Sequence, residues 1–131
     1  MADAYLTRRG SVVKTGATVC DGHNNDALVI PGLTERMNAM IMLCDENLYD
    51  STAENEEYIT AITVEKGVIT GLTAVSESSG LVFHSLDSIH HTFEIRFVDD
   101  YGYIEYANDP MPDYGDPPYF AVGIPYKYIL Y

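Results

Sequence analysis

Histidine and cysteine are the side chains in this sequence best suited to catalysis or to binding a transition metal. There are six of them: His23, His84, His90, His91, Cys20 and Cys44. Zinc sites and catalytic thiols need such residues at short, defined spacings, and the sequence contains neither an HExxH nor a CxxC pattern. His90 and His91 are adjacent, so in a strand their rings would point to opposite faces and could not share a metal. We therefore expect no zinc site, no cofactor and no enzyme activity.

The two cysteines each follow an apolar run, where a small buried thiol is the usual role of a free cysteine. A Cys20–Cys44 disulfide remains an alternative, because the sequence does not give the geometry that a bridge requires. Two cysteines do not make a disulfide framework, so we expect synthesis in a reducing cytoplasm.

Aspartates near the C-terminus are the remaining candidates for a metal site, as oxygen ligands for Ca²⁺. They are Asp99, Asp100, Asp109, Asp113 and Asp116. Their spacing does not match an EF-hand loop, and aspartate beside proline or glycine is a common turn former. We expect an exposed acidic loop at 107–118, which holds four prolines, rather than a calcium site.

Tyrosine is the dominant aromatic residue, with eleven Tyr, four Phe and no Trp, and eight of the tyrosines lie from position 101 onward. Tyrosine gives a large contact area with few rotors to immobilise, so it is enriched at protein interfaces and on surfaces that stack against sugars. Cross-strand aromatic pairing within a sheet is the alternative role. The residues that we predict to bind a partner are Tyr5, Arg8, Arg9, Tyr101, Tyr103, Tyr114 and Tyr119.

The net charge excludes several classes of partner. With 20 acidic against 7 basic residues the chain carries a formal charge of −13, so it repels phosphate backbones and anionic lipid. No apolar run of about 20 residues is present to span a membrane, and the start of the chain lacks the apolar region of a signal peptide. We expect neither nucleic acid nor a membrane as partner.

Short runs rich in Val, Ile, Thr, Phe and Tyr alternate with turn signals along the chain, a pattern typical of an antiparallel β fold. The expected strands are 17–20, 27–30, 39–44, 58–64, 68–75, 81–84, 92–98, 103–106, 119–122 and 126–131. We therefore predict an all-β antiparallel sandwich, or a barrel-like sandwich, of about eight to ten short strands. Residues 15–131 would form this single domain.

Two hairpins are the clearest elements. In the first, strand 59–64 turns through Glu65-Lys66-Gly67, with positions 59, 61 and 63 expected on one face and 60, 62 and 64 on the other. In the second, Phe93, Ile95 and Phe97 alternate with polar residues, which predicts that these three side chains face the core. The second hairpin is expected to turn through positions 99–102.

Helical signals are weak, and we expect at most a short helix at 33–40 or at 51–58, where Ser51 and Glu54 form a capping-box pattern. Segment 45–57 holds six acids in thirteen residues and is predicted to be a solvated loop. Residues 1–14 are mostly polar and contain Arg8 and Arg9. We expect them to form an arm that a partner orders, since an arm of this length buries too little surface alone.

Short motifs at both ends of the chain form a recognisable set. The chain opens with AYLTRRG at 4–10, continues with GATV at 16–19 and LVIPGL at 28–33, and closes with YKYILY at 126–131. These segments resemble the AYxxRRG, GTFT…ItIpGL and KYIxY motifs of small virion proteins, often tail-associated, from phages and prophages of Gram-positive gut bacteria. The middle of such relatives is often glycine-rich, whereas 45–57 is acidic here. The resemblance implies a virion component and no catalytic residue.

Three classes of function remain open on the sequence. The leading expectation is a non-enzymatic phage structural protein of the tail, baseplate or capsid surface. Such a protein would be made in the host bacterial cytoplasm and assembled with other virion proteins or with copies of itself. The alternative is a carbohydrate- or receptor-binding β module, with a host surface glycan as partner. A small enzyme or enzyme inhibitor is the third class.

Overall fold

The computed structural model describes residues 14–19, 27–44, 46–52, 55–107, 120–121 and 123–131. These residues form two antiparallel sheets of seven and three strands, which do not close into a barrel, so the predicted fold class is confirmed. The strands are β1 (Lys14–Val19), β2 (Leu28–Pro31), β3 (Ala39–Met42), β4 (Leu48–Thr52), β5 (Asn55–Glu65), β6 (Val68–Ser76), β7 (Gly80–Phe83), β8 (Phe93–Val98), β9 (Tyr101–Tyr106) and β10 (Pro125–Leu130).

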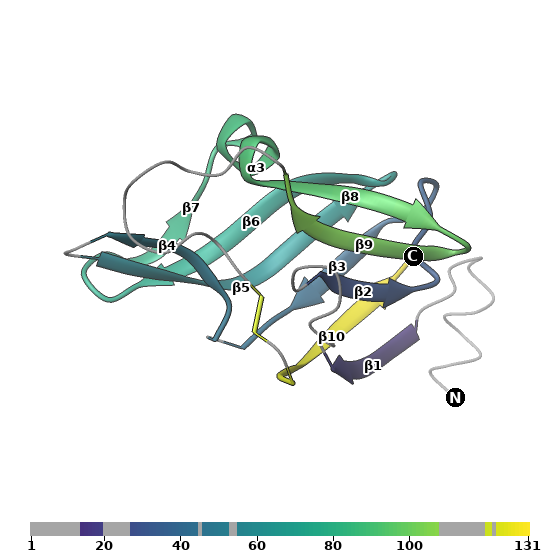
Figure 1. Ribbon diagram of the computed structural model, residues 1–131, viewed down its shortest axis with the longest axis horizontal. Coiled ribbons are helices and arrows are strands. Elements are labelled where there is room, and N and C mark those ends of the chain that lie inside the picture. Colours follow the sequence, from purple (N-terminus) through teal and green to yellow (C-terminus); the bar gives the residue numbers. More distant parts are fainter. Residues whose placement is uncertain (1–13, 20–26, 45, 53–54, 108–119, 122) are drawn as a thin grey trace.

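The seven-stranded sheet has the order β1-β10-β3-β5-β6-β7, and β4 pairs with β5 on the same side as β3. The eleven-residue strand β5 makes this possible, because β3 pairs with its C-terminal half and β4 with its N-terminal half. The smaller sheet has the order β2-β9-β8 and lies across the larger one (Figure 1). Buried apolar side chains from both sheets form a single core cluster between them.

One tyrosine joins the two sheets through its hydroxyl group. Tyr126 of β10 is buried, and its hydroxyl donates to the Val29 carbonyl oxygen at 2.6 Å. The same hydroxyl accepts from the Val29 N–H at 3.0 Å. Val29 lies in β2, at the edge of the smaller sheet, so one phenol satisfies both backbone groups that this residue turns away from β9.

Both expected hairpins are present. Lys66 and Gly67 connect β5 to β6, and Asp99 and Asp100 connect β8 to β9. All four residues have positive φ angles, which two-residue hairpin turns favour. The second turn is shorter than predicted, because position 101 already belongs to β9.

The predicted core face of β8 is confirmed, with graded burial. Phe93 is buried and stacks on Phe120 with ring centroids 5.3 Å apart. Ile95 and Phe97 are half-buried and pack against the same core.

Strict alternation along β5 was the wrong expectation. The register between β5 and β6 shifts between Ile59 and Ala61, and Ile59 and Ile62 are both buried. The bulge adds one residue to β5, so the face that points inward changes at this position.

Most of the described residues of the acidic segment 45–57 form strands, so the expected solvated loop is wrong there. Residues 48–52 form β4, and 55–57 begin β5. Leu48 and Tyr49 are buried, so apolar side chains at these positions hold the segment against the core despite the acids around them. The described residues of 51–58 lie in β4 and β5 rather than in the expected helix, and Ser51 pairs with Glu56 across the two strands.

The short helix lies elsewhere, at α3 (Leu86–Thr92), and positions 33–40 contain turns in its place. The side chain of Ser85 caps α3 by accepting from the Ser88 N–H at 3.2 Å. His90 and His91 lie on this helix, between the strands expected at 81–84 and 92–98. Ile89 of the same helix is fully buried against the core.

Three smaller expectations can be compared with the described residues. Cys44 is exposed rather than buried, because the inward and outward alternation of β3 continues through Leu43 and turns Cys44 outward. Positions 120 and 121 belong to no strand, so the strand expected at 119–122 is wrong there. Lys14 is the first residue of β1. Cys20, residues 1–13 of the expected arm and positions 108–118 of the expected loop lie outside the described residues.

Candidate assembly surfaces

The predicted partner-binding residues divide into two groups. Two lie in β9 and are described, namely Tyr101 and Tyr103. Five lie outside the described residues: Tyr5, Arg8, Arg9, Tyr114 and Tyr119.

Tyr101 and Tyr103 lie together on the outer face of the smaller sheet. Their ring centroids are 6.3 Å apart and their planes differ by 26°. The alternation of β9 turns both side chains outward while Ile104 is buried. Tyr101 is 42% exposed, so its ring is accessible to a partner.

Arg96 of β8 completes this surface, which we call the tyrosine face (Arg96, Val98, Tyr101, Tyr103 and Glu105). The guanidinium carbon lies 4.4 Å from the centroid of the Tyr103 ring, and Nε donates to Glu105 Oε1 at 2.9 Å. The hydrogen bond to Glu105 raises the pKa of Arg96 above its already high usual value. Arg96 is thus a fixed cation beside a flat aromatic surface, which suits contact with a carboxylate, a hydroxyl group or another ring.

The outer face of the larger sheet carries a second surface that the sequence analysis did not identify. In β3, Ala39 and Ile41 point into the core while Met40 and Met42 are exposed. On the same face, β6 and β7 contribute the exposed residues Val75, Leu81 and Phe83. We call these five the apolar outer face (Met40, Met42, Val75, Leu81 and Phe83).

Strand register makes this surface continuous. Met42 lies opposite Ala61, Ala61 opposite Thr73, and Thr73 opposite Phe83, so one row crosses four strands. A second row joins Met40, Thr63 and Gly71, and a third joins Tyr58, Val75 and Leu81. None of the residues named in these three rows is charged. At the β10 side the first row ends at a charge, because Lys127 lies opposite Met42.

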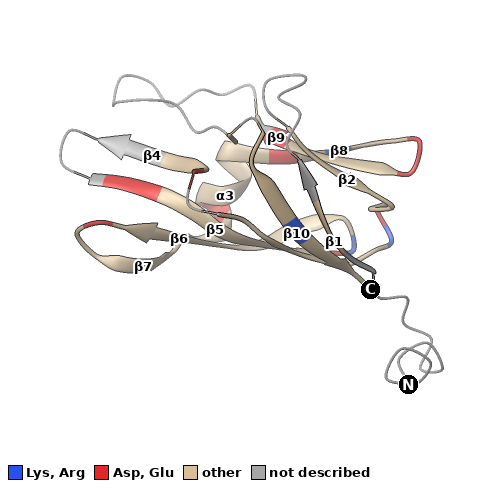
Figure 2. Cartoon of the chain, turned by 90° about the horizontal axis from the view of Figure 1, so that it is seen from below, with Lys and Arg blue, Asp and Glu red and all other residues tan. Residues whose placement is uncertain are grey.

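Acidic residues lie mainly around this surface rather than on it. Figure 2 shows red segments at turns and strand ends, including the β6–β7 and β8–β9 turns, whereas most of β6 and β7 is tan. These turns carry Glu77, Asp99 and Asp100. A chain with 20 acids thus presents an uncharged, partly apolar face.

Of the apolar outer face, the β3 residues and the Leu81-Val82-Phe83 run of β7 had a signal in the sequence. Ala-Met-Ile-Met at 39–42 is apolar at both alternating positions, which is typical of a strand covered on both faces.

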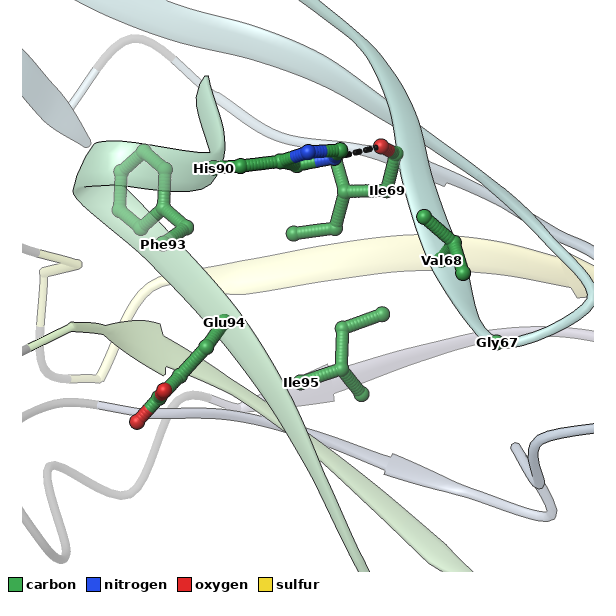
Figure 3. Close-up of a pocket in the computed structure, with 7 residues that line it drawn as sticks. All are labelled: Gly67, Val68, Ile69, His90, Phe93, Glu94 and Ile95. Atoms are coloured by element: carbon green, nitrogen blue, oxygen red, sulfur yellow. Dashed lines mark hydrogen bonds between the residues drawn. The ribbon is translucent and has the colours of Figure 1, made fainter. Parts of the chain in front are cut away.

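A pocket of about 240 Å³ lies between the start of β6, the end of α3 and β8 (Figure 3). Val68, Ile69, Phe93 and Ile95 supply most of its lining. His90 Nε2 lies 2.6 Å from the Ile69 carbonyl oxygen, and the Glu94 carboxylate points away from His90. The imidazole is thus engaged by the backbone, and the pocket offers a small apolar surface rather than an acid–base pair.

A polar cluster of side chains from β4, β5, α3 and the residue that follows β7 comes closest to catalytic geometry. His84 Nε2 is 2.6 Å from Glu57 Oε1, and the His84 ring lies 4.0 Å from that of Tyr49, centroid to centroid. The Tyr49 hydroxyl is 2.7 Å from the Ser88 hydroxyl. Ser88 is therefore engaged by the tyrosine rather than by the imidazole, and this arrangement differs from that of an activated nucleophile.

Within the described ranges, no three His, Cys, Asp or Glu side chains come close enough together to hold a metal ion. In the same part of the chain, no helix is long and apolar enough to cross a membrane.

We compared the chain with protein-family models, curated proteins and solved structures, and none of these comparisons found a match.

Proposed function

We propose that this protein is a non-enzymatic structural component of a bacteriophage particle, in the tail, the baseplate or the capsid surface, and that it acts by protein–protein assembly. The apolar outer face is the observation that carries the proposal. Contiguous exposed apolar side chains on an otherwise charged protein indicate a surface that a protein partner covers. Methionines such as Met40 and Met42 suit this role, because their flexible side chains adapt to a partner.

The phage assignment draws on the motifs at both ends of the chain, and their arrangement supports treating them as one unit. Segment 16–19 lies in β1 and pairs with 125–128 of β10, within or next to the YKYILY motif. Tyr126 of that motif bonds to Val29 of the LVIPGL motif. The C-terminal motif thus contacts both N-terminal segments across a long stretch of sequence, as parts of one structural signature would.

The partners in this proposal are other virion proteins and further copies of the chain. Assembly would take place in the host bacterial cytoplasm, and the protein would then remain in the virion. Arg8 and Arg9 would bind acidic groups on a neighbouring subunit, where guanidinium–carboxylate pairs orient the contact.

The test is incorporation of a variant into particles. Met42→Lys places a charge at the β3 end of the first row of the apolar outer face, at an exposed position where the fold tolerates it. Val68→Lys is the matched control, since Val68 is 50% exposed at the start of β6, outside the three rows. We expect M42K to be lost from purified particles and V68K to be retained. Normal incorporation of M42K would contradict the proposal.

The tyrosine face favours a second candidate function, recognition of a host surface glycan. An exposed tyrosine ring can stack on the apolar face of a sugar, while Arg96 and Glu105 offer hydrogen bonds to its hydroxyl groups. Glycan-array binding that Tyr101→Ala abolishes would support this function. Tyr131→Ala is the control, because Tyr131 follows β10 of the other sheet and is similarly exposed. Equal loss in both variants, or no binding by the natural chain, would count against it.

A further inference from the structure

Strand β7 is an edge with an unusual surface. In the described part of the chain it pairs with β6 alone, and it lies at one end of the seven-stranded sheet (Figure 1). Leu81 is 59% exposed and Phe83 is 72% exposed, the highest values among the large apolar side chains described. Val75 lies directly opposite Leu81 in β6 and is exposed too, so the apolar surface reaches the edge and continues inward from it.

The other edge strands carry features that prevent unwanted pairing. β2 ends with Pro31, and the Tyr126 hydroxyl occupies the backbone groups of Val29. β8 contains Glu94 and Arg96, β1 begins with a lysine, and the β4–β5 pairing contains a register shift. Charges, prolines and bulges of this kind are the usual protection against strand addition.

Strand β7 has only its length of four residues to limit pairing. Its sequence, Gly-Leu-Val-Phe, contains no charge and no proline. Its register with β6 runs without a shift from Ser76–Gly80 to Thr73–Phe83. An unprotected, uncharged edge on a protein that protects its other described edges indicates that this edge is paired in the assembled state.

We infer that β7 pairs with β7 of a second copy, antiparallel about a twofold axis, so that the two seven-stranded sheets become one continuous sheet. This inference rests on the assembly function proposed above and names its partner and its contact. Paired residues in an antiparallel ladder point to the same face. A register centred on Val82 places Leu81 of one copy opposite Phe83 of the other, on the outer face, and repeats the contact by symmetry.

Charge favours a second copy over a basic partner as the occupant. A basic partner would be recognised by acidic side chains, and β7 presents none. Two bodies of charge −13 repel each other, and an uncharged edge is where they approach with the least penalty. Since salt screens repulsion between exposed charges, the dimer should become more stable as ionic strength rises. A complex with a basic partner would instead become weaker as ionic strength rises.

The contact is small. A four-residue strand pair with its flanking side chains falls below the ~800 Å² per partner of a standard interface. We therefore expect the isolated dimer to dissociate in the micromolar range, with fuller pairing in the particle, where other contacts raise the effective concentration.

Sedimentation of the full chain at rising micromolar concentrations tests the contact. We expect the natural chain to move from its monomer mass of 14.6 kDa to twice that mass, and to do so at lower concentration in higher salt. Phe83→Lys should remain monomeric throughout, while the control Val68→Lys should dimerise like the natural chain. Both changes introduce the same charge at an exposed position, so neither should affect folding.

Cross-linking tests the register. A central pair of antiparallel residues has Cα atoms about 4.5–5.5 Å apart, within the range of a disulfide. Val82→Cys in a background with both Cys20→Ser and Cys44→Ser should give a disulfide-linked dimer through position 82 under mild oxidation, confirmed by peptide mapping, whereas Leu81→Cys in that background should not.

Four results would overturn the inference: a natural chain that stays monomeric in all salts, a dimer that salt weakens, an F83K chain that still dimerises, or cross-linking at position 81 but not 82. None of these results would contradict the proposed function if M42K is still excluded from particles.

Discussion

The hydroxyl group of Tyr126 offers a test of how the two sheets are joined. Tyr126→Phe removes one oxygen atom and keeps the buried ring, so packing is nearly unchanged. The Val29 N–H and carbonyl oxygen both lose the partner they have in the structure, at 3.0 Å and 2.6 Å. A buried backbone group left unsatisfied costs about 1–3 kcal/mol. Val29 is half-buried, so water can reach it in part and a cost near the lower end of that range, about 1–1.5 kcal/mol, applies to each group.

The expected loss for Tyr126→Phe is therefore about 2–3 kcal/mol of unfolding free energy, summed over the two groups. For a chain of this size that corresponds to a decrease in Tm of roughly 6–15 °C. Urea denaturation followed by far-UV circular dichroism measures the change as a shift in midpoint with an unaltered slope.

Tyr128→Phe is the control for this experiment. Tyr128 lies two residues further along β10, packs partly against the same core, and has no hydroxyl hydrogen bond among the described residues. Its substitution should change stability by less than about 0.5 kcal/mol. If Y126F is as stable as Y128F, the Tyr126 hydroxyl does not join the sheets and the reasoning is refuted.

Three further outcomes are expected. Phe93→Ala should lower the free energy of unfolding, measured by urea denaturation, by about 3–5 kcal/mol. Phe97→Ala should lower it clearly less, because Phe97 is half-buried, and the reverse order would contradict the assigned face. Gly102→Ala should lower the free energy of unfolding by about 1–3 kcal/mol, since the added carbon would lie 2.7 Å from Leu33 Cδ2 in the core. An unchanged free energy of unfolding would mean that Leu33 moves aside freely. Deleting residues 1–10 should leave Tm nearly unchanged and abolish assembly; a truncated chain that assembles normally would show that the arm is dispensable.

The parts of the fold that the sequence predicts well are those fixed by neighbouring residues. The β8–β9 hairpin combines a period of two with a turn sequence, and a slip by one residue would expose Phe93, so local pattern and burial agree. The parts predicted wrongly depend on distant partners. Segment 45–57 looks solvated because of its acids, yet β5 supplies a strand for it to pair with and the core supplies a place for Leu48.

The same distinction applies to the candidate surfaces. Tyr101 and Tyr103 could be chosen from residue type alone, and strand geometry brings them together. The apolar outer face could not be chosen in this way, because Met42 and Phe83 lie 41 positions apart and meet in one row only through the register of β3, β5, β6 and β7. The bulge in β5 helps to set that register, and the sequence alone does not reveal it.

The composition of purified particles tests the central claim most directly. Particles from a strain that carries this gene would be purified by density gradient and analysed by quantitative mass spectrometry. The account predicts that the chain copurifies with the particles as a stoichiometric component, in numbers comparable to those of known structural proteins. Its absence from intact particles, while it is abundant in the host cytoplasm, would contradict the account.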